Sequence, residues 1–237
     1  MHSNNWDYAD RFRELITVSG GKTEGEYVIT PGCLIISRPQ ISSEASFLFD
    51  YVNIDTAAPG YERMAEFNYH LPHMNFPSKP RTGQEFVDNG NHNYPHSAFK
   101  HMTIGFLLAG ISIETSLELA SQPGVEITKV ISSDTPAMNN PFYRIQGSPA
   151  EITEFKNYLS RVINPASFNL PTEFKNMMLP ACKATIIVLT MSLCKYDALF
   201  QQMKENHGKE FNEILAMMCD KLSISYPLAI KPTKEYK

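Results

Sequence analysis

Histidines are the side chains in this sequence best suited to metal binding or to proton transfer near neutral pH, and they are unevenly distributed. Five of the seven lie close together, and these are His70, His73, His92, His96 and His101. Imidazole is a common zinc ligand, so a histidine metal site is one hypothesis. The spacing is irregular and no acidic or thiol ligand lies in register with it, so the sequence predicts no metal ligand set.

The elements that would position two of these histidines lie in the stretch His96–Pro123. His96 and His101 bracket a predicted turn, and Met102–Ala109 is an apolar run of the length of a strand. Ser112 is the predicted N-cap of a short helix that ends at the following Pro-Gly pair. From the residues alone, one hypothesis is that both histidines stabilise the turn through hydrogen bonds.

The same stretch resembles the flavin-dependent thymidylate synthases, the ThyX family. That family carries a turn of the form H-S-x-L-E-H, a strand, then G-[IV]-S-R, then a helix ending in Q-x-x-R-H-R. Here the turn reads HSAFKH from His96 to His101, and the strand exit is Gly110-Ile111-Ser112. Ser121-Gln122-Pro123 stands where the family has R-H-R, and Ile113 stands where it has the arginine of G-[IV]-S-R.

The C-terminal third is similar to the same family. There, a helix ending in A-R-x-V-L-P is followed by a strand and then by a helix ending in L-R. Here Lys175–Pro180 matches the first motif with Asn176 at its arginine, and Lys204 stands at the arginine of the second. The resemblance covers residues 90–230 approximately, and residues 1–89 match no motif of the family.

The resemblance implies an α/β (α+β) fold of the ThyX type, with a mostly antiparallel sheet and helices packed against it. It implies one domain, with a divergent, loop-rich part over residues 1–89 and a ThyX-like core over residues 90–237. It also implies a homotetramer that binds FAD and a dUMP-like nucleotide at subunit interfaces. The family reaction is the reductive methylation of dUMP to dTMP with methylene-tetrahydrofolate and NADPH, in which the flavin carries the hydride.

The resemblance also supplies candidate site residues, while no catalytic residue is assigned. The cofactor-binding candidates are His96, as a flavin contact, His101, as a brace of the turn, and Ser121 and Gln122 at the R-H-R position. The substrate-binding candidates are Lys204 and Arg144, which would replace lost arginines. Guanidinium groups bind planar and anionic partners bidentately, and uncharged side chains bind phosphate more weakly. We therefore expect little or no ordinary dUMP methylation.

Two alternatives to a divergent enzyme stay open. One is a non-catalytic paralogue that binds a nucleotide or another protein, and the other is a metal protein built on the histidine cluster. The sequence contains no nucleophile motif of the form G-x-S-x-G, no P-loop and no G-x-G-x-x-G dinucleotide motif.

Composition and charge set wider bounds. The 237 residues suit one domain, and a net charge of −4 with a pI near 6.0 argues against broad adhesion to nucleic acid or to anionic membranes. None of the four cysteines forms a C-x-x-C spacing. This absence favours free thiols in a reducing compartment. No signal pattern or membrane-spanning apolar run is seen, so we expect a soluble cytoplasmic protein. No internal repeat is evident.

Local patterns predict the remaining elements. Asp7–Ile16 is a helix candidate, and the apolar segment Phe47–Val52 is expected to pair with the β-rich segment Tyr27–Ser37. Residues 132–149 are expected to be loop. Ser148 then begins the clearest helix, because Pro149 follows it and Glu151 stands three positions later, which is a capping box.

Overall fold

A computed structural model of the chain divides it into two compact units, each built from three separate segments. Unit 1 combines Met1–Leu34, Leu107–Ser121 and Ile127–Leu189. Unit 2 combines Ile35–Phe106, Gln122–Glu126 and Thr190–Lys237. The residues that the structure describes are 8–43, 46–54, 59–76, 78, 96–129, 142–162, 182–204, 208–227 and 229–236. The expected boundary at residues 89/90 lies outside them.

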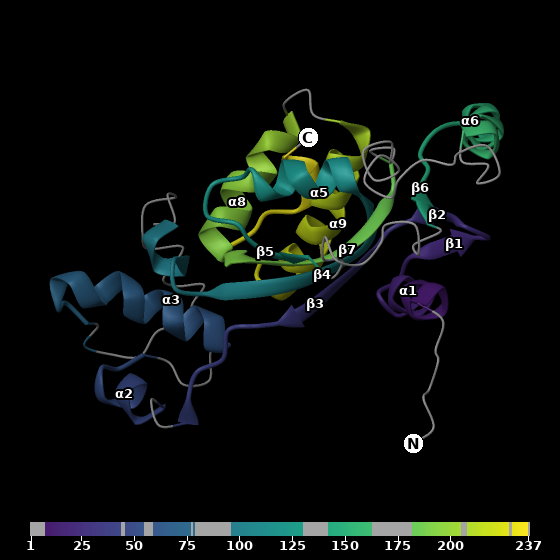
Figure 1. Ribbon diagram of the computed structural model, residues 1–237. Helices are drawn as coiled ribbons and strands as arrows, with labels where there is room; N and C mark the ends of the chain where they lie inside the picture. The colour runs from purple at the N-terminus through teal and green to yellow at the C-terminus, as the bar shows by residue number, and fades with distance from the viewer. Residues whose placement is uncertain are drawn as a thin grey trace, which may run out of the picture. The chain divides into compact units, whose positions relative to one another are not determined.

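Both units contain helices. Figure 1 labels the α-helices along the chain. Those of unit 1 are α1 (Tyr8–Val18), α5 (Ile113–Ala120) and α6 (Pro149–Val162). Those of unit 2 are α2 (Ser46–Tyr51), α3 (Gly60–His70), α8 (Leu193–Gln201) and α9 (Lys209–Ser225). Unit 2 also holds the short 3-10 helices η2 (Leu71–His73), η3 (His96–Phe99), η6 (Gln202–Lys204) and η7 (Thr233–Glu235).

The described strands form two sheets. They are β1 (Lys22–Glu24), β2 (Tyr27–Thr30), β3 (Gly32–Ser37), β4 (Thr103–Ser112), β5 (Glu126–Lys129), β6 (Tyr143–Arg144) and β7 (Ala184–Ser192). One sheet has the order β1-β2-β6, in which β1 pairs antiparallel and β6 pairs parallel with β2. The other has the order β3-β4-β7-β5. This combination of helices and sheets is the α+β class that the sequence predicts.

Two helix starts confirm the predicted caps. The Ser112 hydroxyl accepts a hydrogen bond from the Thr115 backbone N–H at 3.0 Å, which satisfies one of the free N–H groups at the start of α5. At α6, the Ser148 N–H donates to the Glu151 carboxylate at 2.7 Å, and the Glu151 N–H donates to the Ser148 hydroxyl at 3.4 Å. This reciprocal pair is the predicted capping box.

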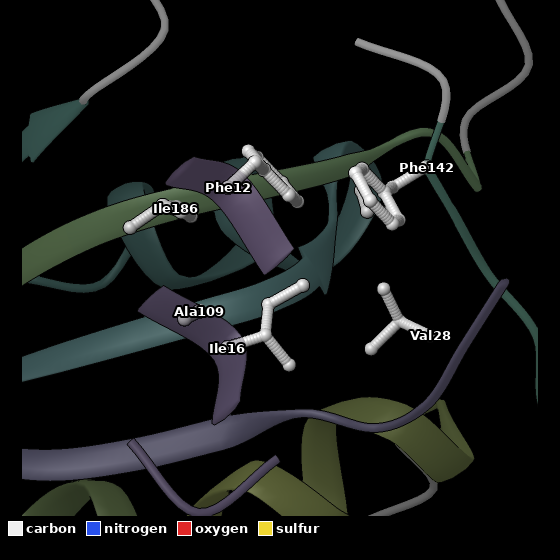
Figure 2. Packing of buried hydrophobic residues seen from close by; sticks show 7 residues of the cluster. Phe12, Ile16, Val28, Ala109, Phe142 and Ile186 are labelled. Carbon is white, nitrogen blue, oxygen red and sulfur yellow. The ribbon is translucent and has the colours of Figure 1, made fainter. Parts of the chain in front are cut away.

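The core of unit 1 lies where α1 packs on the strands. Figure 2 shows this cluster, whose members are Phe12, Ile16, Val28, Ala109, Phe142, Ala184 and Ile186. The rings of Phe12 and Phe142 stack with their centroids 5.1 Å apart. Gly110 has a φ of 81°, and a Cβ there would lie 2.8 Å from a methyl of Val28. Only glycine therefore fits at this close approach.

The core of unit 2 is built around α8 and α9. The buried face of α9 consists of Phe211, Ile214, Leu215, Met218, Cys219 and Leu222. On α8, the Tyr196 hydroxyl donates to the Ile104 carbonyl at 3.1 Å. The C-terminal tail is also fixed here, because the buried Tyr236 donates its hydroxyl hydrogen to the carboxylate of Asp197.

The structure reveals a repeat that the sequence does not show. β4–α5 and β7–α8 are both strand–serine–helix segments, with Ser112 and Ser192 at the junctions in the same extended conformation. The residue after each serine donates its N–H to the carbonyl that precedes the other strand: Ile113 to Lys183 and Leu193 to Met102, both at 2.9 Å. A glutamine follows each serine by ten residues, at positions 122 and 202.

Two predictions for individual elements are wrong. Ser46–Tyr51 forms helix α2, whereas Phe47–Val52 was expected to pair as a strand. Phe47 and Tyr51 are both largely exposed and are four residues apart, so this short apolar run does not mark a buried strand. The segment 132–149, expected to be loop, includes the short strand β6.

Among the described residues, no helix is long and apolar enough to cross a membrane.

Candidate functional site

The histidine-bracketed turn is held firmly in unit 2. Its two central residues, Ala98 and Phe99, are buried in η3. The Asn68 side-chain amide of α3 donates to the Ala98 carbonyl at 2.9 Å, and η3 also contacts α8. His101 is exposed at the end of the turn, and the side chain of His96 lies outside the described residues. The packing of α3 and α8 therefore positions the turn.

Gln122, at the centre of the R-H-R position, is joined to a residue that the sequence did not single out. The Gln202 amide nitrogen donates to the Gln122 side-chain oxygen at 2.9 Å. Gln202 opens η6, which ends at Lys204, so two sequence-predicted candidates come to the same end of α8. The side chain of Lys204 lies outside the described residues. The signal that could have found Gln202 is the common ten-residue spacing from Ser112 and Ser192.

Ser121 and Gln122 form an uncharged, hydrogen-bonded segment. Ser121 is the C-cap of α5, and its exposed hydroxyl donates to the Glu118 carbonyl at 2.7 Å. Ile113, which the sequence resemblance matches to an arginine of the family, is the first residue of the same helix. Asn176 lies outside the described residues. Ile113, Ser121 and Gln122 thus supply hydrogen-bonding or apolar groups and no guanidinium.

Arg144 also lies in unit 1, and its guanidinium is bound to the protein backbone. It is buried in β6, and one terminal nitrogen donates to three backbone carbonyls. The acceptors are Ile29 at 2.6 Å, Ile145 at 2.7 Å and Val28 at 3.2 Å. The guanidinium therefore fastens β2 to β6, and this arrangement ties it to the backbone of its own unit.

The described part of the chain contains no set of side chains that could bind a metal ion. No group of three or more histidine, cysteine, aspartate or glutamate side chains converges there. The nearest arrangement is on α3, where His70 Nε2 lies 3.9 Å from a Glu66 carboxylate oxygen and both residues are buried. His73, His92 and His96 have side chains outside the described residues.

The sequence analysis missed a buried pair in unit 1, formed by Tyr143 and Lys183. The two residues lie directly opposite each other across an antiparallel bridge between β6 and the start of β7. Backbone hydrogen bonds of 2.8 and 3.0 Å flank the pair, so it belongs to the non-hydrogen-bonded class, in which facing side chains approach most closely. The Lys183 ammonium donates to the Tyr143 hydroxyl at 3.3 Å and lies 4.4 Å from the ring centroid.

Burial shifts the proton affinities of this pair in opposite directions. Lys183 is only 3% exposed, and loss of hydration lowers the pKa of its amine from 10.5 to about 8, against weaker opposing effects of Glu26 and Cys182. Burial, with the nearby Cys182, raises the pKa of the Tyr143 phenol to about 12. The sequence signal was a lysine directly before a largely apolar strand.

Comparisons with known proteins place the fold. No protein-family model matches the chain, and no curated protein matches it in sequence. Thymidylate Synthase X (ThyX) from Helicobacter pylori, solved with FAD and dUMP, is similar in structure with a TM-score of 0.57 and 10% identity, over 84% of this chain and 96% of that chain.

Two further solved structures agree. A second ThyX structure from Helicobacter pylori, complexed with FAD and dUMP, has a TM-score of 0.53 and 12% identity over 72% of this chain and 93% of that one. The UMP/dUMP methylase PolB from Streptomyces cacaoi, bound with 5-Br dUMP, has a TM-score of 0.51 and 11% identity over 89% and 96%. At these identities the likeness concerns the fold, and the chain has the ThyX-like fold that the sequence predicts.

Proposed function

We propose that the chain binds FAD and a dUMP-like nucleotide on a ThyX-like scaffold but has lost or altered the ordinary methylation of dUMP. The proposal is carried by two features taken together. A ThyX-like fold covers 84% of the chain, and neutral residues stand at those described positions that the sequence resemblance matches to arginines of the family. Solved relatives with this fold hold FAD and dUMP, which supports a flavin and a pyrimidine nucleotide as ligands. Methylene-tetrahydrofolate and NADPH belong to the proposal only if methylation persists.

The size of the expected loss follows from the charges. A hydrogen bond to a charged group contributes about 1.5–3 kcal/mol, so losing two of them weakens the binding of a phosphate or flavin by about 3–6 kcal/mol. That corresponds to roughly a hundredfold to ten-thousandfold in dissociation constant. Ser121 and Gln122 are already hydrogen-bonded to the protein and carry no charge to offset it. Lys204 is the remaining cation at a family arginine position and is proposed to bind the nucleotide phosphate as a point charge.

The test has a binding arm and an activity arm. Purified protein is examined for flavin absorbance and for a rise in melting temperature with dUMP. The gene is then introduced into a thymidine-requiring bacterial strain. We expect nucleotide or flavin binding without growth. Robust growth without thymidine would show that the neutral residues suffice, and absence of both ligands would refute the binding proposal in favour of a protein-binding paralogue.

The proposed flavin contact of His96 has its own test. Removing one hydrogen bond of this kind costs about 1 kcal/mol, so His96→Ala should weaken FAD binding roughly fivefold with the fold unchanged. Lys100→Ala is the matched control, because Lys100 lies exposed in the same turn. If the wild type, His96→Ala and Lys100→Ala bind FAD with equal affinity, His96 does not contact the flavin.

A further inference from the structure

Lys183 differs from Lys156, a second lysine that lies over a tyrosine ring in the described part of unit 1. Lys156 lies 4.8 Å from the Tyr27 ring centroid and 3.5 Å from a Glu24 carboxylate oxygen, and its side chain is 29% exposed. Lys183 makes the same type of ring contact, but no carboxylate lies within 4.0 Å of its amine among the described residues. A carboxylate near a lysine favours the charged form of the amine; Glu26 has this effect on Lys183, but it is smaller than the opposing effect of burial.

The Lys183 side chain also lies away from the apolar core of unit 1. Side chains alternate between the two faces of a strand, and Ala184 and Ile186 belong to the cluster around α1. Lys183 and Thr185 therefore lie on the opposite face of β7, and both are buried polar residues. The carbonyl of Lys183 is bound to the N–H of Ile113 at the start of α5, which fixes the backbone of the lysine.

We propose that Lys183 is a reactive amine that forms an imine with small aldehydes, with the Tyr143 hydroxyl as its acid–base partner. The inference rests on the burial of the amine, on the phenol oxygen 3.3 Å away, and on the finding that no described residue places a carboxylate within ion-pair distance of the amine. Desolvated lysines without a carboxylate partner are the ones that act as nucleophiles towards carbonyl compounds. This reactivity is independent of the proposed flavin and nucleotide binding.

The reaction needs no oxidant or reductant. The lone pair of the uncharged amine adds to the aldehyde carbon, the carbonyl π bond breaks, and the oxygen takes up a proton to give a carbinolamine. The carbon–oxygen bond then breaks, water leaves, and a carbon–nitrogen double bond forms, so amine and aldehyde give imine and water. The Tyr143 phenol, which burial keeps protonated, delivers a proton to the departing hydroxyl and recovers one from the nitrogen.

The experiment measures which lysines react first with formaldehyde at pH 7 in the presence of cyanoborohydride, which traps the imine as a stable methylamine. Peptide mass spectrometry follows the rate at each lysine of the full chain. At pH 7 an amine of pKa about 8 has an uncharged fraction about 300-fold larger than an amine of pKa 10.5. Burial and lower basicity offset part of this, so we expect Lys183 to react at least about tenfold faster than Lys156.

Two variants test the roles of the pair. Lys183→Arg should abolish this fast labelling and leave the rate at Lys156 unchanged. Tyr143→Phe keeps the aromatic ring and removes the hydroxyl, so the rate at Lys183 should fall about tenfold or more if the phenol transfers protons. Circular dichroism checks that both variants fold. Labelling of Lys183 no faster than Lys156 in the wild-type protein would overturn the proposal, and an unchanged rate in folded Tyr143→Phe would overturn the role of the phenol.

Discussion

Replacing Lys183 with methionine should reduce the pH dependence of the free energy of unfolding between pH 7 and 9.5. Burial lowers the pKa of this amine from 10.5 to about 8 in the folded protein. Between those two values the unfolded chain binds more protons at this position than the folded chain does. The contribution of this lysine to the free energy of unfolding therefore rises with pH across the window. Methionine has no charge, so the variant lacks this contribution.

The magnitude follows from the same pKa values. If the whole pKa shift of Lys183 is converted into free energy, it lowers the free energy of unfolding by about 3 kcal/mol at pH 7 and by about 1.4 kcal/mol at pH 9.5. The change between the two pH values is about 2 kcal/mol. Screening by nearby solvent reduces it, so we expect the difference between the variant and the wild type to change by about 1–2 kcal/mol. Loss of the hydrogen bond to Tyr143 and any packing defect affect both pH values equally and cancel in this comparison.

The assay is urea unfolding of both proteins at pH 7, 8, 9 and 9.5. The range stops below pH 10 because the raised pKa of Tyr143 would lower wild-type stability above that value. Lys156→Met is the control, because that lysine lies beside a carboxylate and is partly exposed. If the stability difference between Lys183→Met and the wild type stays constant with pH, the conclusion that burial lowers the pKa of Lys183 is refuted.

Three further predictions concern stability and assembly. Ser112→Ala should lower the free energy of unfolding by about 1 kcal/mol because the Thr115 N–H loses its cap, whereas Ser121→Ala at the exposed C-cap should change it by less than about 0.5 kcal/mol. Tyr236→Phe should lower it by about 1–3 kcal/mol, because the partly buried carboxylate of Asp197 loses a donor. Light scattering should show a homotetramer, four times the 26.8 kDa of one chain.

Each of these has a clear contrary result. Equal unfolding midpoints for the two serine variants would mean that the cap of α5 contributes no more than an exposed hydroxyl. A Tyr236→Phe protein as stable as the wild type would show that water or another donor replaces the phenol. A monomer at micromolar concentration would argue strongly against a family-type site, since such sites are shared between subunits.

Local sequence signals identified those elements whose determinants lie within a few residues. The Ser148–Glu151 capping box and the Ser112 N-cap were predicted correctly, because each is decided by side chains three positions apart. The apolar segment around Phe47 was not, because a short apolar run has the same composition in a helix and in a strand. The resemblance of the turn, strand and helix in the stretch His96–Pro123 led correctly to the ThyX-like fold.

The parts of the site that were missed depend on contacts between distant residues. Tyr143 and Lys183 are forty positions apart, and Gln122 and Gln202 are eighty apart, so neither pair has a local signature. The contacts of Arg144 were not predicted either, because its β2 acceptors are backbone carbonyls, which carry no side-chain signal. The repeat of the two strand–serine–helix segments is likewise a matter of backbone hydrogen bonds.

The discontinuous units affect how the protein can fold while it is being synthesised. Unit 1 is complete only after Leu189 has left the ribosome, and unit 2 must wait for Lys237, although its first segment ends at Phe106. At about 5–20 residues per second, the interval between the emergence of Phe106 and that of Lys237 is roughly 7–26 s. The apolar strand residues of β4 lack their β7 neighbours during most of that time. We therefore expect the nascent chain to expose apolar residues during synthesis, which is the surface that ribosome-associated chaperones bind.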